Sequence, residues 1–128
     1  MPGADRPPPS QRLRAAQRVK RQRDFRAARE QGRRADCGPF LLVWRARPAP
    51  TDTSPARVGV VASKAALGDA VVRNRAKRRL REVFRRNQEA VPPGLDLVLT
   101  ARPALLRLSL PEVEERFLQA CRRLAPRP

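Results

Sequence analysis

The chain has 128 residues, a length that suits one domain with a single modest core. Its 29 lysine and arginine residues stand against 12 acidic residues, which gives a formal charge of +17 and favours a polyanionic partner, nucleic acid first. There is no histidine, so histidine-dependent catalytic and metal sites are excluded. No run approaches the ~20 apolar residues of a membrane span and the N-terminus has no signal-peptide core, so we expect a cytoplasmic protein with no membrane contact.

The other candidates for catalysis or metal binding are weak. Cys37 and Cys121 fit no metal-ligand spacing, and in a reducing compartment we expect two free thiols. The acids are scattered and most lie beside arginines, so we interpret Asp24, Asp69 and Asp96 as caps or arginine partners. We therefore expect no catalytic residue and no metal site in this chain. A nuclease that uses carboxylates and a metal ion by itself is an alternative that no motif favours.

The N-terminal half predicts a tail, a helix and two strands. Residues 1–17 contain several prolines and arginines and little to bury, which predicts a disordered basic tail. Residues 19–31 predict a helix that ends at Gly32. An apolar run within 39–46 and the sequence RVGVVAS at 57–63 predict two strands, joined by a loop rich in proline, serine and threonine.

The C-terminal half predicts a helix, a strand and a second helix. Asp69 is placed to cap a helix over 70–88, whose buried stripe we expect to be Val72, Ala76, Leu80, Val83 and Phe84. Residues 95–101 predict a strand. Ser109 and Glu112 form a capping-box pair for a last helix, which we expect to bury Leu110, Val113, Phe117, Ala120 and Leu124. Because a long helix separates two strands, we expect a parallel pair with a helical crossover in one α/β sandwich.

Residues 73–86, RNRAKRRLREVFRR, are the most informative segment, with eight basic residues and one acid. At helical spacing Arg73, Lys77 and Arg81 fall in one row, on a side away from the apolar stripe. The polar face continues through Asn74, Arg75, Arg78, Arg79, Arg85 and Arg86. A run of charges is usually a solvated surface. The almost complete lack of acidic balance here predicts phosphate binding instead.

The string AVVRNRAKRRLRE resembles the RNR signature of the bacterial ribonuclease P protein subunit family. Three further segments are similar to the family's pattern in the same order. They are 18–32 with its Asp-Phe pair, RVGVVASK at 57–64 and DLVLTARP at 96–103. Four segments at the right spacing make the resemblance specific, and it covers most of the chain after the tail.

The resemblance implies one family domain at 18–125 with the element order αβββαβα. Its fold would be an α/β (α+β) two-layer sandwich of the ribosomal-protein-S5-domain-2-like kind, with a short first strand near 33–37. It also implies a small mixed sheet with a left-handed βαβ crossover through helix 70–88. That crossover runs against the ordinary right-handed rule.

The resemblance also implies an activity that is shared between a protein and an RNA. The family assists endonucleolytic removal of the 5′ leader from precursor tRNA, in which catalysis belongs to the RNA subunit and Mg²⁺ is bound mainly by that RNA. The protein would bind ribonuclease P RNA and precursor tRNA, and would require no protein partner. A ribosomal-protein-like RNA binder or RNA chaperone is the alternative, and the identity of the RNA partner distinguishes the two.

Site residues follow from the matched positions. The resemblance implies contact with the RNA subunit through Arg73, Asn74, Arg75, Lys77, Arg78, Arg81 and Arg85. It implies that the leader lies in a cleft between the signature helix and the sheet, with Phe25 as a stacking platform and Arg29 and Lys64 as cations. Core packing is the alternative for Phe25.

This chain departs from the family pattern at two aromatic positions. Arg29 and Val43 stand where the family commonly has cleft aromatics. A guanidinium plane at Arg29 could stack on a base in place of a ring. Trp44 is next to Val43, but a one-residue step points it to the other face, so we expect it in the core or on the outer surface.

Overall fold

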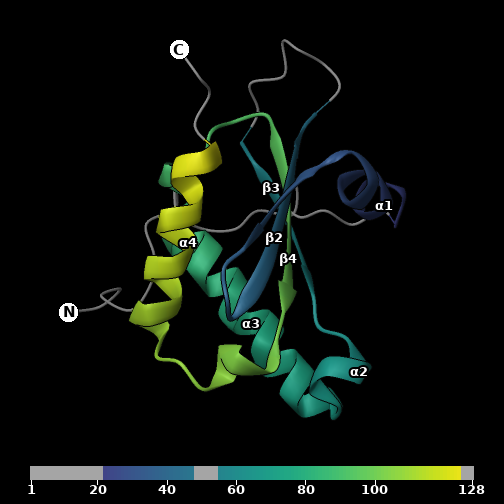
Figure 1. Cartoon of the computed structure of the whole chain (residues 1–128), viewed down its shortest axis with the longest axis vertical. Helices are drawn as coiled ribbons and strands as arrows, with labels where there is room; N and C mark the ends of the chain where they lie inside the picture. The colour runs from purple at the N-terminus through teal and green to yellow at the C-terminus, as the bar shows by residue number, and fades with distance from the viewer. Residues whose placement is uncertain (1–21, 48–54, 125–128) are drawn as a thin grey trace, which may run out of the picture.

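The computed structural model describes residues 22–47 and 55–124, so the predicted tail at 1–17 lies outside it. In chain order the elements are α1 (Gln22–Gln31), β1 (Arg33–Asp36), β2 (Phe40–Ala46), β3 (Arg57–Val61), α2 (Lys64–Leu67), α3 (Ala70–Asn87), η3 (Gln88–Ala90), β4 (Leu95–Ala101), η4 (Pro103–Leu106) and α4 (Leu110–Leu124) (Figure 1). This order confirms the predicted αβββαβα arrangement. The one-turn helix α2 is an addition, in a stretch that was predicted as a plain connection.

The strands form one mixed sheet in the order β1-β2-β4-β3. β2 pairs antiparallel with both β1 and β4, whereas β3 and β4 are parallel. The predicted parallel pair with α3 as its crossover is therefore confirmed. The left-handed sense of that crossover stays a prediction from the resemblance. β4 lies between two strands, which suits its almost continuous apolar sequence.

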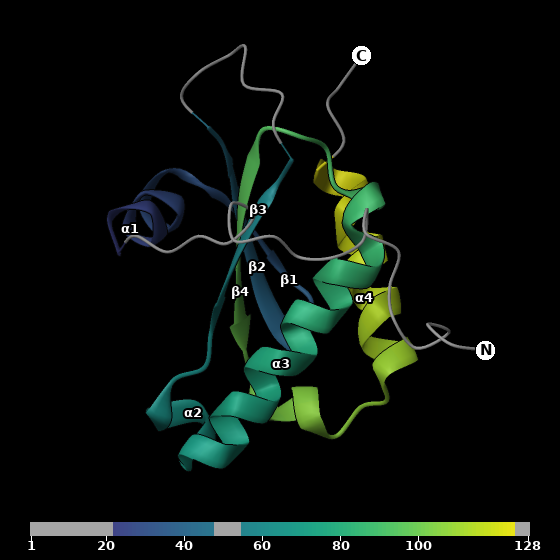
Figure 2. The same cartoon turned by 180° about the vertical axis from the view of Figure 1, so that it is seen from behind.

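One face of the sheet carries the main core, under α3 and α4 (Figures 1 and 2). The strands supply to it, among others, Phe40, Leu42, Trp44, Val58, Leu97 and Leu99, and the two helices supply Ala76, Leu80, Val83, Phe84, Val113, Phe117 and Leu124. The predicted stripes of both helices are thus confirmed, with Val72 and Leu110 half-buried at their edges. Trp44 belongs to this core, which is one of the two positions expected for it.

On the opposite face, α1 packs against β2 and β4. Ala28 packs with Val43 and Val98 in a small buried cluster. A Cβ at Gly32 would lie 2.3 Å from the carbonyl oxygen of Ala28 and 2.7 Å from that of Trp44, so only glycine fits where the helix ends. The predicted end of the first helix therefore has a steric cause.

Side-chain caps begin the two long helices where the sequence predicts them. The Asp69 carboxylate accepts a hydrogen bond from the Val71 N–H (2.9 Å) at the start of α3. The Ser109 hydroxyl accepts from the Glu112 N–H (3.3 Å) before α4. The same hydroxyl donates to the Glu112 carboxylate (3.0 Å), so the predicted pair forms through side chains.

Cys37 and Cys121 are free thiols, as predicted, and the structure shows that both are buried. Burial raises the pKa of Cys37 and raises the pKa of Cys121 to about 12. Both groups therefore stay protonated at neutral pH, which makes them poor nucleophiles.

Candidate nucleic-acid interface

The cations of α3 lie on the sides of the helix that do not face the core. Asn74, Arg75, Arg78 and Arg81 are exposed, whereas Arg73, Lys77 and Arg85 are partly covered. The buried side of the same helix holds Ala76, Leu80, Val83 and Phe84. The helix is thus divided into an apolar side that fixes its position and a polar side that is left for a partner.

Arg79 has a structural role in the protein. Its Nη1 donates to the carbonyl oxygens of Leu105 (3.0 Å) and Leu108 (2.5 Å). These bonds hold the connection between β4 and α4 against α3.

The C-terminal third of α3 is balanced by acids. Arg85 and Glu82 form a two-point pair, with 3.0 Å between Nε and Oε2, and this bond is the main reason that the pKa of Glu82 is lowered. Arg86 lies 3.4 Å from the Glu114 carboxylate of α4. Positive charge without a carboxylate partner is therefore concentrated toward the N-terminal end of the helix.

At that end the cations have no protein partner among residues 22–47 and 55–124. This holds for Arg73, Arg75, Lys77 and Arg78. The Arg73 Nε is buried and has no hydrogen-bond acceptor among those residues. A buried donor without an acceptor is unfavourable by about 1–3 kcal/mol, so an acceptor supplied by a ligand would be stabilising there.

The sheet face under α1 contains a second set of predicted residues. Register places Leu41, Thr100 and Val61 side by side across β2, β4 and β3, and all are half-buried. Phe25 is also half-buried and packs on the α1 side of the sheet, beside this row. Phe25 is therefore both a packing residue and a partly accessible ring.

Lys64 follows Val61 closely and begins α2, where it is exposed. Figure 2 shows α1 and α2 toward the same side of the molecule, with α2 beyond one end of the sheet. The side chain of Arg29 lies outside the described part, so its predicted role stays a prediction.

The resemblance implied a leader cleft between the signature helix and the sheet, and the structure corrects this. The space between α3 and the sheet is filled by core side chains such as Leu80, Phe84 and Leu99. A nucleic acid strand cannot lie there. The accessible sheet surface is the other face, which holds Phe25 and the row through Leu41 and Val61. The sequence carries one signal for this open face, because Asp96 and Thr100 of β4 alternate with the core residues Leu97 and Leu99.

A buried carboxylate lies at the far end of the α1 face. Register places Arg45, Asp96 and Arg57 side by side on β2, β4 and β3. Arg57 donates to both carboxylate oxygens of Asp96, at 2.8 and 2.7 Å, and Arg45 and Arg47 lie 3.6 and 3.8 Å away. The interpretation of Asp96 as an arginine partner is confirmed, as is that of Asp69 as a cap. The Asp24 side chain lies outside the described part.

The described residues contain no group of three His, Cys, Asp or Glu side chains close enough to hold a metal ion. Within the same part of the chain, no helix is long and apolar enough to cross a membrane. The chemistry available from the described α3 cations is therefore the binding of anions.

The fold and this site together define a small α+β sandwich with an arginine-rich helix suited to bind a polyanion. Residues 13–125 match the protein-family model described as Ribonuclease P. The chain is 35% identical over 106 residues to a ribonuclease P protein component of Brevibacillus brevis, covering 83% of this chain and 81% of that protein. It is 44% identical over 93 residues to that of Streptomyces avermitilis, covering 67% and 73%.

A solved structure also places the chain with ribonuclease P proteins. The ribonuclease P protein of Thermotoga maritima superposes with a TM-score of 0.71 at 30% identity, over 85% of this chain and 98% of that one. The chain belongs to the ribonuclease P protein family, the family that its RNR segment resembles.

Proposed function

We propose that this chain is the non-catalytic protein subunit of a cytoplasmic ribonuclease P. It binds the RNA subunit through α3 and the 5′ leader of precursor tRNA on the α1 face of the sheet. The RNA subunit, with the Mg²⁺ that it binds, cleaves the leader. One observation carries the proposal. In a chain of this family, the exposed end of α3 holds cations that no described carboxylate balances.

The chemistry of α3 suits a phosphate backbone. A guanidinium presents a planar fork of donors that matches two phosphate oxygens at once. Arg75 and Arg78 are exposed and lie off the buried stripe, so they can reach a partner without moving the helix. Arg85 contributes less, because its Nε and Nη2 already donate to Glu82.

The α1 face suits a single strand. Binding of single strands combines a stacking surface with nearby positive charge. Phe25 supplies a partly accessible ring beside the half-buried Leu41 and Val61, and Lys64 supplies an exposed cation at the end of that row. No described acid cluster offers a metal centre here, so we assign Mg²⁺ to the RNA.

Substitutions on the polar side and on the buried side of α3 test whether this helix binds RNA. Arg73→Ala and Arg75→Ala should weaken assembly with ribonuclease P RNA, because each removes a phosphate-binding cation without opening a core cavity. Leu80, by contrast, is fully buried, and Leu80→Ala should lower the free energy of unfolding by about 2–5 kcal/mol. Thermal melts by circular dichroism and titration of the RNA subunit measure the two effects.

The matched control is Arg107→Ala, which removes an exposed arginine outside α3. It should change neither stability nor assembly appreciably. If the Arg73 and Arg75 variants unfolded as readily as Leu80→Ala, both arginines would be packing residues. If they assembled as well as Arg107→Ala, α3 would not be the RNA-binding helix.

A salt titration should distinguish the contributions of Phe25 and Lys64 to leader binding. Phe25→Ala should weaken the reconstituted complex for precursor tRNA by about 1–3 kcal/mol per stacked base, with little change for mature tRNA or in salt dependence. Lys64→Ala should reduce the slope of log affinity against log salt by about 0.7, the value for one phosphate contact on a single strand.

The substrates for this titration are precursors with and without a leader. Equal weakening of both by Phe25→Ala would assign Phe25 to packing alone. An unchanged salt slope for Lys64→Ala would remove α2 from the leader path.

A further inference from the structure

A small cavity lies between the edge strand β1 and α4. Its volume is about 110 Å³, and it is lined by Ala35, Asp36, Cys37, Arg116, Gln119, Ala120 and Arg123. Roughly 10–15 Å³ of such space holds one water, so the cavity has room for a larger polar group. Figure 1 looks onto β1 and α4 with α3 behind them, and Figure 2 has α3 in front. The cavity is therefore separate from the cations of α3.

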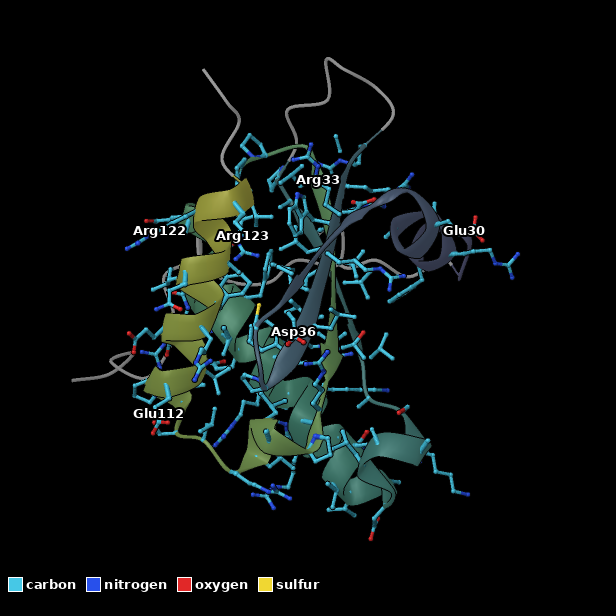
Figure 3. All side chains as sticks on the ribbon, in the orientation of Figure 1. Glu30, Arg33, Asp36, Glu112, Arg122 and Arg123 are labelled. Carbon is cyan, nitrogen blue, oxygen red and sulfur yellow. The ribbon has the colours of Figure 1, made fainter. Side chains whose placement is uncertain are left out.

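Two arginines of α4 supply the charge of the cavity. Arg116 and Arg123 are exposed and lie two turns apart on one side of the helix. Figure 3 shows Arg123 on the side of α4 toward the sheet and Arg122 on its outer side. A Cβ at Gly38 would lie 3.3 Å from Nη1 of Arg116, so this guanidinium reaches across to the turn after β1.

The acid that lines the cavity is already neutralised. Oδ1 of Asp36 accepts hydrogen bonds from Nη1 of Arg102 (2.5 Å) and from the Gly38 N–H (2.9 Å). The Gly38 bond first and the Arg102 bond second lower the pKa of Asp36, which keeps it charged and paired at neutral pH. Neither Arg116 nor Arg123 has a carboxylate partner in the described part of the chain. Two positive charges thus border the cavity without compensation.

We propose that this cavity binds a phosphate of RNA, as a second backbone contact separate from α3. Two guanidinium groups and the Gln119 amide place N–H donors around a space of the right size for a tetrahedral oxyanion. The inference rests on the proposed function, because RNA is taken as the polyanion. A contact here means that RNA binds this subunit on more than one side.

The test is a salt titration with the double variant Arg116→Gln/Arg123→Gln. The cognate ribonuclease P RNA is first titrated with the wild-type or variant protein, and precursor tRNA is then titrated into the assembled complex. In one of these arms the slope of log affinity against log salt should fall by about 1.4–1.8, two contacts at 0.7–0.9 each. Affinity at low salt should fall about tenfold. The arm that shows the change identifies which RNA supplies the phosphate.

The matched control is Arg107→Gln/Arg122→Gln, which removes the same charge from exposed positions outside the cavity. A second variant, Gln119→Glu, adds a carboxylate between Arg116 and Arg123. It should weaken the same RNA arm, while its melting temperature stays equal to or above that of the wild type, because it forms new pairs along the helix.

Equal slopes for the double variant and its control in both arms would overturn the inference, as would unchanged RNA affinity in Gln119→Glu. Failure of the proposed function looks different. In that case the wild-type protein itself would not bind ribonuclease P RNA. The wild-type titration therefore distinguishes the two failures.

Discussion

Replacing Asp96 with asparagine should lower the free energy of unfolding by about 3–5 kcal/mol, the range for removing one partner of a buried ion pair. Small domains have about 5–15 kcal/mol in total, so the variant should lose a large part of its stability. Chemical denaturation of the wild type and the variant measures the difference.

The size of this effect follows from the register of the sheet. The Asp96 side chain is fully buried, and those of Arg45, Arg47 and Arg57 are only 11%, 8% and 25% exposed. Without the carboxylate, these partly desolvated guanidinium groups would lose a shared negative partner. Because Arg45, Asp96 and Arg57 come from three different strands, the loss should destabilise the whole sheet.

Asp36→Asn is the matched control. Asp36 also pairs with an arginine, Arg102, but its side chain is 65% exposed. Water screens such a pair, so its removal should leave the free energy of unfolding almost unchanged. If both aspartate variants were equally stable, the ion cluster around Asp96 would not stabilise the fold.

Local patterns in the sequence predicted the elements well. The strand at 95–101 is predicted to the residue, because a dense apolar run is bounded by turn residues on both sides. The start of α3 is also predicted correctly, since Asp69 is a side-chain cap that acts within one turn. These signals depend on neighbours along the chain and need no tertiary contact.

Tertiary contacts account for what the sequence did not predict. Arg78 and Arg79 are adjacent arginines on one helix, yet Arg79 binds two carbonyl groups of the connection to α4 and Arg78 is exposed. The accessible face of the sheet was also missed, although β4 carries a signal for it: Leu97 and Leu99 lie in the main core, whereas Asp96 and Thr100 alternate with them on the other face.

The sequence predicted one part of the candidate site and missed the parts that depend on tertiary contacts. Charge and helical spacing located the cations of α3, because both follow from the sequence alone. The cluster around Asp96 and the cavity beside Arg116 depend on strand order and on contacts between α4 and β1. The spacing of Arg116 and Arg123 on one side of the last helix was the signal available for the cavity.

Omitting the RNA subunit should have the largest effect on activity. The chain has no histidine, and its described residues contain no acid cluster that could hold a metal ion. Under the proposed function, the protein positions RNA and its own side chains do not break the phosphodiester bond. In that case cleavage should occur only when the RNA subunit is present.

The most direct test is cleavage of precursor tRNA by the purified protein, scrupulously freed of RNA, with and without ribonuclease P RNA. We expect no product from the protein alone, and Mg²⁺-dependent release of the leader when the RNA is added. Arg73→Ala/Arg75→Ala protein should reduce that activity most at protein concentrations where assembly limits the rate. Cleavage at the mature 5′ end by RNA-free protein, at a rate that added RNA does not change, would contradict the account.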